Sequence, residues 1–297
     1  MKVKLLATDG LGKFEEVTWE KPPIKDDEIC VEALMTGVCR SDIDMMSGNF
    51  GPLPLHMQGH EGIGKVVEVG KNVVHVKPHD IVATRGEPAY ADYYNVRDGE
   101  FVVIPEAHPR YILEPVACGI NVIEQAKDQL HAREGKGKRL LILGSGFLAW
   151  VAYSMLISDS YQFKIDIVGN NNRHLWKSKL KSKYKGTYDV VIDLSSTNYV
   201  FTQPILNNNA LVIFAAQKPV TTDFSNLLWK ACTMVFPSPR SPAFIDCMHE
   251  ARAMIASGEL NVDEFWTKGY ERKNWRDAFN DGQNRPKNYS RGYIVWH

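Results

Sequence analysis

The sequence has few cysteines, and none of them are close together. The five cysteines stand at positions 30, 39, 118, 232 and 247 and form no Cys-x-x-Cys pair. An odd number of widely spaced cysteines argues against a disulfide framework. We therefore expect reduced thiols and a cytoplasmic protein.

Long apolar runs and a net charge are also missing. No stretch approaches the roughly 18 apolar residues that a membrane span needs, and residues 1–17 carry charge too early for a signal peptide. The 35 basic residues balance 35 acidic ones, so the formal net charge is zero. That balance gives no general attraction to nucleic acid or to an anionic membrane. We expect neither as a partner.

The chain changes character near residue 114. Before residue 105, short runs with β-type alternation predict six or more strands and little helix, typical of a β-barrel-like domain. After residue 114, apolar β-branched runs alternate with helical stretches. This alternation predicts an α/β fold with a parallel sheet covered on both faces. Residues 243–258 predict a further helix, which Gly258 could cap.

Residues 37–70 combine glycines with possible metal ligands. Seven glycines lie in this stretch, which indicates tight turns and close backbone packing. Cys39 and His60 are too far apart to be neighbours on a helix, so a fold must bring them together. One thiol, one imidazole and nearby carboxylates are too few for a closed structural zinc site. They suit a catalytic zinc that keeps one position open.

A glycine turn follows the apolar run 139–143. The sequence Gly144-Ser145-Gly146-Phe147-Leu148-Ala149 matches the dinucleotide fingerprint Gly-x-Gly-x-x-Ala and precedes an apolar helical segment. Such a turn lets the backbone approach a pyrophosphate at the N-terminus of the helix. The predicted cofactor-binding residues here are Gly144, Gly146, Phe147 and Leu148.

The next expected strand departs from the NAD pattern. Gly169 stands where an acid should hold the ribose 2′-hydroxyl, and Asn170 and Arg173 follow it. An arginine can bind a 2′-phosphate, so NADP(H) is favoured over NAD(H). Alternatively, Arg173 and the lysines after it line a solvated helix face. Only about fifteen residues remain before the next strand, so we expect a sheet reduced to five strands.

Residues 37–42 and 59–66 read Gly-x-Cys-x-Ser-Asp and Gly-His-Glu-x-x-Gly-x-Val. This pattern resembles the catalytic domain of the zinc-dependent medium-chain dehydrogenases, the alcohol and polyol dehydrogenase family. Glu114-Pro115 resembles the Glu-Pro of its sorbitol and threonine dehydrogenase branch. The resemblance implies a GroES-like β-barrel catalytic domain (1–119 and 251–297) and a Rossmann doubly wound parallel-sheet domain (120–250).

The resemblance also implies one catalytic zinc per chain. Cys39 and His60 are the implied ligands, while Glu61 and Glu114 compete for the remaining positions. In the family, which glutamate binds varies with the enzyme and its ligand state. The structural-zinc lobe of the family is absent, because it needs four closely spaced cysteines and the short region between Val82 and Ala89 contains none. This deletion makes the chain shorter than its relatives.

The same resemblance assigns roles to the neighbours of Cys39. Ser41 would relay a proton from the substrate oxygen, and Asp42 would hydrogen-bond a ligating imidazole. Asp44 could accept the relayed proton, or the relay could end in water. Arg40 could reach a cofactor phosphate, or it could be an ordinary surface arginine. The implied catalytic residues are Ser41, Asp42, Asp44 and Glu61.

The leading hypothesis is a zinc-dependent oxidoreductase that uses NADP(H) and acts on a small-molecule secondary alcohol or polyol, or its ketone. A zinc-free quinone or enone reductase of the same superfamily has no need of Cys39, His60 and Glu114 together. An inactive dinucleotide-binding protein is the third alternative, because the nucleotide domain is short. By analogy with the family, we expect a homodimer joined through the last sheet strand, near 231–236.

Overall fold

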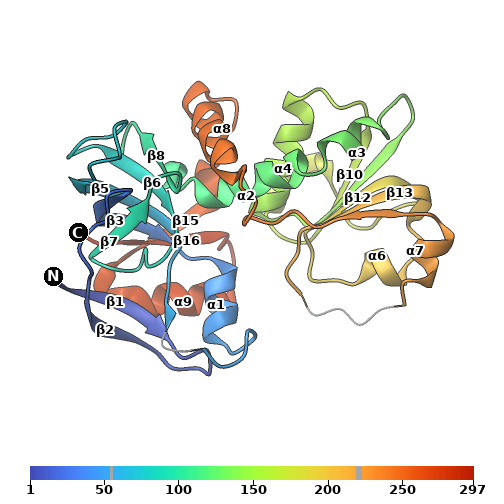
Figure 1. The fold of residues 1–297 in the computed structure, drawn as a ribbon. Helices are drawn as coiled ribbons and strands as arrows, with labels where there is room; N and C mark the ends of the chain where they lie inside the picture. Colours follow the sequence, from blue (N-terminus) through green and yellow to red (C-terminus); the bar gives the residue numbers. More distant parts are fainter. Residues whose placement is uncertain (54–55, 219–222) are drawn as a thin grey trace. The chain divides into compact units, whose positions relative to one another are not determined.

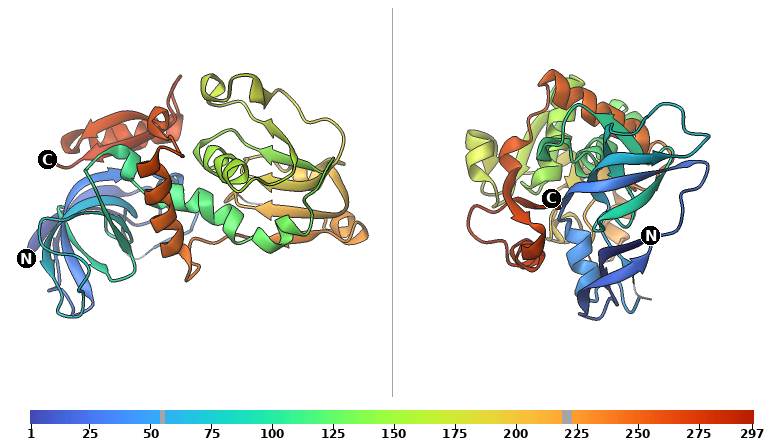
Figure 2. Two further views of the ribbon diagram at one scale, coloured as in Figure 1. Left: turned by 90° about the horizontal axis from the view of Figure 1, so that it is seen from above. Right: turned by 90° about the vertical axis from the view of Figure 1, so that its left-hand side faces the viewer.

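The computed structural model describes residues 1–53, 56–218 and 223–297. The chain forms two compact units (Figure 1). One contains Met1–Pro115 and Met248–His297, and the other contains Val116–Cys247. Both chain ends therefore belong to the first unit (Figure 2). Among the described residues, no helix has the length and apolar character needed to cross a membrane.

The first unit is built mainly from antiparallel strands. One sheet has the order β2-β1-β4, and a seven-stranded sheet has the order β15-β16-β3-β5-β6-β8, with β7 also paired to β3. Its strands are β1 (Lys2–Thr8), β2 (Phe14–Glu20), β3 (Glu28–Gly37), β4 (His56–Met57), β5 (Glu61–Val69), β6 (Ile81–Arg85), β7 (Tyr93–Arg97), β8 (Phe101–Ile104), β15 (Trp266–Glu271) and β16 (Arg291–Val295).

The helices of this unit pack beside its sheets, and the 3-10 helices are short. They are α1 (Arg40–Met46), α9 (Trp275–Asn284), η1 (Pro109–Tyr111), η3 (Asp263–Phe265) and η4 (Arg272–Asn274). The helices α2 (Glu114–Glu124) and α8 (Phe244–Ser257) contain the two points where the chain passes between units. The residue after α8, Gly258, has a φ of 79°, as expected for a glycine that ends a helix.

The strands β3 and β5 position the candidate metal ligands. They run antiparallel, with Thr36 opposite Gly62. The carboxyl end of β3 therefore lies beside the amino end of β5. Gly37 leaves room for the Glu61 carboxylate, because a Cβ at position 37 would overlap Glu61 Oε2. Residues 39 and 60, far apart in sequence, thus meet at the same end of these two paired strands.

The second unit contains a parallel sheet with helices on both faces (Figure 1). The strand order is β11-β10-β9-β12-β13-β14. Its elements are α3 (Lys127–His131), β9 (Arg139–Leu143), α4 (Phe147–Ser158), β10 (Lys164–Val168), α5 (Arg173–Trp176), η2 (Lys177–Lys179), β11 (Leu180–Lys181), β12 (Tyr188–Asp193), α6 (Tyr199–Thr202), β13 (Leu206–Phe214), α7 (Ser225–Trp229) and β14 (Thr233–Val235). The predicted α/β class is confirmed.

The expectation of a five-stranded sheet is wrong. A sixth strand, β11, pairs in parallel with Ile167 and Val168 at the end of β10. It fits into the short connection because it contains only two residues and because α5, with four residues, forms barely one turn. The sheet therefore keeps six strands in a shortened chain.

Candidate active site

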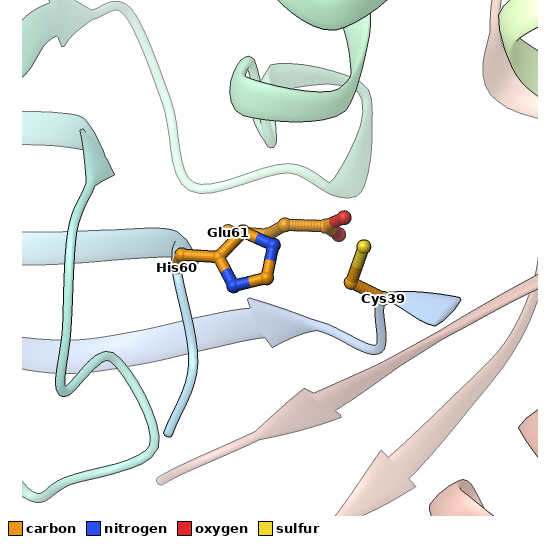
Figure 3. Close-up of side chains that lie close together, drawn as sticks. All are labelled: Cys39, His60 and Glu61. Atoms are coloured by element: carbon orange, nitrogen blue, oxygen red, sulfur yellow. The ribbon is translucent and has the colours of Figure 1, made fainter. Parts of the chain in front are cut away.

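Three potential metal ligands converge where β3 ends and β5 begins. Cys39 is the N-cap of α1, His60 directly precedes β5, and Glu61 begins β5. One ligand atom from each residue lies within 4.8 Å of the other two. The carboxylate of Glu61 points toward the sulfur of Cys39, and the imidazole lies beside them (Figure 3). The fold thus brings together the cysteine and histidine that the sequence left 21 residues apart.

This donor set fits a zinc ion. Sulfur, imidazole nitrogen and carboxylate oxygen are the usual zinc ligands, and tetrahedral ligands at 2.0–2.3 Å from the metal lie roughly 3–4 Å from one another. Because the ligand atoms all lie within 4.8 Å of one another, the group would have to contract by no more than roughly 1–2 Å to reach that geometry. Glu61 is fully buried, and only 21% of the His60 side chain is exposed. Three protein ligands leave the fourth position open, as a catalytic site requires.

Asp42 and Tyr90 fix the orientation of the imidazole. Asp42 Oδ1 lies 3.4 Å from His60 Nδ1, and Asp42 Oδ2 accepts a hydrogen bond of 2.9 Å from the Tyr90 hydroxyl. That hydroxyl also lies 2.7 Å from the carbonyl oxygen of Gly37. With Nδ1 turned toward Asp42, Nε2 faces the other ligands, which is the arrangement that metal-binding histidines need. Tyr90 is a residue that the sequence analysis missed.

The pKa values of two candidate ligands, His60 and Cys39, are raised. Burial opposes charge on His60, but Asp42 and Cys39 outweigh it and hold the pKa of His60 well above its usual value. Burial, followed by the charge of Glu61, raises the pKa of the Cys39 thiol. A metal must displace a proton from each of these groups, so its apparent affinity should rise with pH.

We expect Tyr90→Phe to weaken zinc binding by about 10–100-fold, because an imidazole whose orienting carboxylate is loosened binds metal less tightly. The matched control is Tyr94→Phe. Tyr94 is equally buried, but its hydroxyl bonds to Thr84 Oγ1 (2.8 Å). The zinc dissociation constant, measured by competition with a chromophoric chelator, checks this prediction. An equal loss of zinc affinity in Tyr90→Phe and Tyr94→Phe would contradict this prediction.

Ser41 lies against the ligand group. Its hydroxyl donates to Cys39 Sγ over 3.2 Å and lies 3.4 Å from His60 Nε2. Asp44 accepts hydrogen bonds from Arg40 Nε (3.0 Å) and Asn49 Nδ2 (3.1 Å). The charge of Asp44 is therefore already balanced by an arginine. Its role as a proton acceptor, like that of Arg40 toward a cofactor, stays a prediction.

Arg291 is a second residue that the sequence analysis missed. Its Nη2 lies 2.6 and 2.5 Å from the two carboxylate oxygens of Glu61, and its guanidinium lies 4.9 Å from the centre of the Trp266 ring. Burial opposes the charge of Arg291, but Glu61 and Cys39, followed by Glu114, raise its pKa. Glu61 would therefore share its charge between Arg291 and a bound metal.

Glu114 begins α2 and is 6% exposed. Within the described part of the chain, the group of ligand atoms at mutual distances below 4.8 Å contains Cys39, His60 and Glu61, and it leaves out Glu114. The charge of Glu114 nevertheless acts on Arg291. Glu114 as a ligand stays a prediction.

The glycine turn in the second unit lies between a strand and a helix, the setting that the dinucleotide fingerprint requires. Gly144 follows β9 with a φ of 116°, and a Cβ there would lie 2.9 Å from the carbonyl oxygen of Leu194. Gly146 is the N-cap of α4. The Phe147 side chain is buried, so only its backbone N–H is available to a phosphate, whereas Leu148 is half-buried. These N–H groups lie at the N-terminus of a twelve-residue helix.

Ser145 connects this turn to the segment after β10. Its hydroxyl donates to Asn171 O (2.7 Å) and accepts from Asn171 N (3.0 Å). Its carbonyl accepts from Asn172 Nδ2 (3.1 Å) and Trp176 Nε1 (3.0 Å). A Cβ at Gly169 would overlap the Ser145 hydroxyl and lie 2.8 Å from Ser145 N. The packing therefore leaves no room for an acid at position 169.

Asn170 and Arg173 are exposed beside this segment. Arg173 begins α5, which ends at Trp176, so the lysines at 177 and 179 belong to the next turn, η2, and not to that helix. Lys179 lies 4.7 Å over the Tyr153 ring. Arg173 and both lysines are exposed, so a solvated basic surface stays the alternative to a phosphate site.

Comparisons with known proteins agree with this fold. The "Alcohol dehydrogenase GroES-like domain" family matches residues 25–107. The chain is 24% identical to D-arabitol-phosphate dehydrogenase of Enterococcus avium over 330 aligned positions, which cover 91% of each chain.

Solved structures show the same architecture. Galactitol-1-phosphate dehydrogenase from Escherichia coli aligns with a TM-score of 0.75 at 16% identity and covers 99% of this chain and 100% of its own. For 2R,3R-butanediol dehydrogenase from Bacillus subtilis the TM-score is 0.76 at 15% identity, with 99% and 100% covered. Residues 25–107 thus form an alcohol dehydrogenase GroES-like domain, and the chain as a whole has the two-unit fold of these dehydrogenases.

Proposed function

We propose that this protein is a zinc-dependent oxidoreductase that transfers hydride between NADP(H) and a secondary alcohol or polyol, or its ketone. The observation that carries the proposal is the convergence of Cys39, His60 and Glu61, whose ligand atoms lie within 4.8 Å of one another. The names of the relatives support the substrate class, because two of them act on phosphorylated polyols and one on a diol. The reducing compartment expected from the cysteines agrees with a cytoplasmic enzyme.

The residues of the first unit would bind the metal, orient the imidazole and transfer the proton of the substrate. A bound zinc would supply Lewis acidity that lowers the pKa of the substrate hydroxyl. Cys39 and His60 would hold the metal with Glu61 or Glu114, while Asp42 keeps Nε2 of the imidazole turned toward it. The Ser41 hydroxyl, within 3.4 Å of His60 Nε2, is placed to take the proton of the substrate. From there the proton would pass to water or to Asp44.

The second unit would bind the cofactor. The N–H groups at the start of α4 would bind the pyrophosphate, and Gly144 would allow the backbone to approach it. NADP(H) is favoured over NAD(H), because the packing of Ser145 excludes a carboxylate at position 169 and Arg173 stands exposed nearby. Arginine can hold a phosphate with two hydrogen bonds.

The test combines metal analysis with activity. We expect about one zinc per chain by elemental analysis. We also expect oxidation of polyols and secondary alcohols with NADP that stops after chelation and returns with zinc. A folded native protein without zinc that reduces enones with NADPH would favour the zinc-free reductase. Dinucleotide binding without turnover of any alcohol or ketone would favour the inactive binding protein.

We further propose a homodimer joined through β14. This strand is at one edge of the sheet, and apolar side chains beside it are exposed: Phe224 by 56%, Leu228 by 76%, Trp229 by 84% and Phe236 by 62%. Exposed apolar groups of this kind next to a strand with one free edge favour association of subunits.

We expect Trp229→Asp to convert a dimer into a monomer of 33.6 kDa, because a buried, unpaired carboxylate opposes the association of the two faces. Ile157→Asp is the control, since Ile157 is also exposed (54%) but belongs to α4. Light scattering coupled to size-exclusion chromatography measures both masses. A native protein that is already monomeric would contradict the proposal.

A further inference from the structure

A buried lysine lies at the carboxyl end of the parallel sheet. The Lys218 ammonium bonds to Asp193 Oδ2 (2.7 Å), to the carbonyl oxygen of Ser195 (3.0 Å) and to that of Thr197. The Lys218 side chain is 7% exposed and that of Asp193 is 0% exposed. All three N–H donors of the ammonium thus have an acceptor.

Asp193 also forms hydrogen bonds within residues 193–197. Its Oδ1 accepts from Ser195 N (3.0 Å) and from Ser195 Oγ (2.9 Å), and the Ser195 and Thr197 hydroxyls lie 2.8 Å apart. Residues 193–197 are therefore fixed by one ion pair and a closed set of hydrogen bonds. A buried ion pair adds little net stability over apolar residues of the same size. The main effect of the Lys218–Asp193 pair is therefore to fix the backbone conformation of residues 193–197.

That segment adjoins the glycine turn. Leu194 N donates to Leu143 O over 2.8 Å, and the Leu194 carbonyl packs against Gly144. The strand order reverses between β9 and β12, and in parallel sheets of this kind a dinucleotide binds at the reversal. The order also divides the sheet into two mononucleotide-binding halves. The glycine turn belongs to the half with β9–β11, and residues 193–197 belong to the half with β12–β14.

We propose that Lys218 is a positioning residue that, through Asp193, fixes residues 194–197 as the wall of the cofactor site on its nicotinamide half. The proposal rests on the dinucleotide binding argued above. Lys218 acts through the segment it holds and needs no contact with the cofactor. It should therefore influence ligands that occupy both halves of the site and leave those confined to the adenosine half unchanged.

The test compares NADP with 2′,5′-ADP, which lacks the nicotinamide half. In Lys218→Met we expect the dissociation constant for NADP to rise at least about tenfold, while that for 2′,5′-ADP changes by less than about twofold. Lys218→Arg should recover much of the affinity for NADP, because it keeps the charge. Lys138→Met, which breaks the more exposed Lys138–Asp189 pair of the same unit, is the control and should leave both constants unchanged.

If Lys218→Met does not fold, Asp193→Asn combined with Lys218→Met removes both buried charges and gives the same comparison. Equal weakening of the two ligands, or none, would overturn the positioning role and leave the proposed function intact. Failure of the native protein to bind either ligand would overturn the proposed function, and this inference with it.

Discussion

Glu61→Gln is expected to remove zinc from the protein and to lower the free energy of unfolding of the first unit by about 3–5 kcal/mol. The variant loses a candidate metal ligand and replaces the carboxylate that faces the Arg291 guanidinium by a neutral amide; only 13% of the Arg291 side chain is exposed. For a unit of this size, the loss corresponds to a fall of roughly 6–20 °C in the melting temperature. Calorimetry and elemental analysis measure the two effects separately.

The double variant Glu61→Gln/Arg291→Met separates the two causes. Replacing the buried cation as well should return most of the lost stability, whereas zinc should stay absent. If both variants retain zinc, Glu61 is not a ligand, and Glu114 is the remaining candidate. If the single variant is as stable as the native protein, the Glu61–Arg291 pair does not stabilise the fold.

Gly169→Asp, the substitution that would create the NAD pattern, is expected to weaken binding of both dinucleotides at least about tenfold. The new Cβ would lie 2.7 Å from Ser145 Cβ and 2.8 Å from Ser145 N, so the glycine turn must shift. Fluorescence titration with NADP and NAD measures the affinities. A gain of NAD affinity with an unchanged melting temperature would contradict the packing argument.

Asn170→Asp is the matched control, because it adds the same charge at an exposed position without a new Cβ. We expect it to weaken NADP binding selectively, by about tenfold relative to NAD, since a carboxylate repels the 2′-phosphate. A variant that weakens both dinucleotides equally would argue against an NADP site at this strand end.

The sequence was informative where the chemistry depends on local spacing. The pattern around Cys39 and His60 and the glycine turn at 144–149 each lie within a short stretch, and the structure forms both locally. Arg291 could not be predicted, because it is 230 residues from Glu61 and meets it through the pairing of β16 with β3. Tyr90 stands in an aromatic run with no feature that singles out its hydroxyl.

The sixth strand and the Ser145–Gly169 contact were not predicted either, because both depend on how separate segments approach one another. The strand β11 has only two residues and exists because β10 offers a free edge, so no hydrophobic periodicity could reveal it. The contact between Ser145 and Gly169 depends on how closely two loops approach. Neither glycine-rich spacing nor charge pattern encodes that distance.

The position of β16 has a consequence for how the protein is made. This strand lies between β15 and β3, so the sheet that carries Glu61 is completed by residues 291–295. During synthesis, domains fold as their residues emerge from the ribosome. The second unit, Val116–Cys247, can then fold while the first still lacks two of its strands. Until residues 291–295 have emerged, Met35–Gly37 at the carboxyl end of β3 lack their partner strand and Glu61 has no arginine beside it. The nascent chain therefore exposes an incomplete cluster of Cys39, His60 and Glu61 to chaperones and free metal.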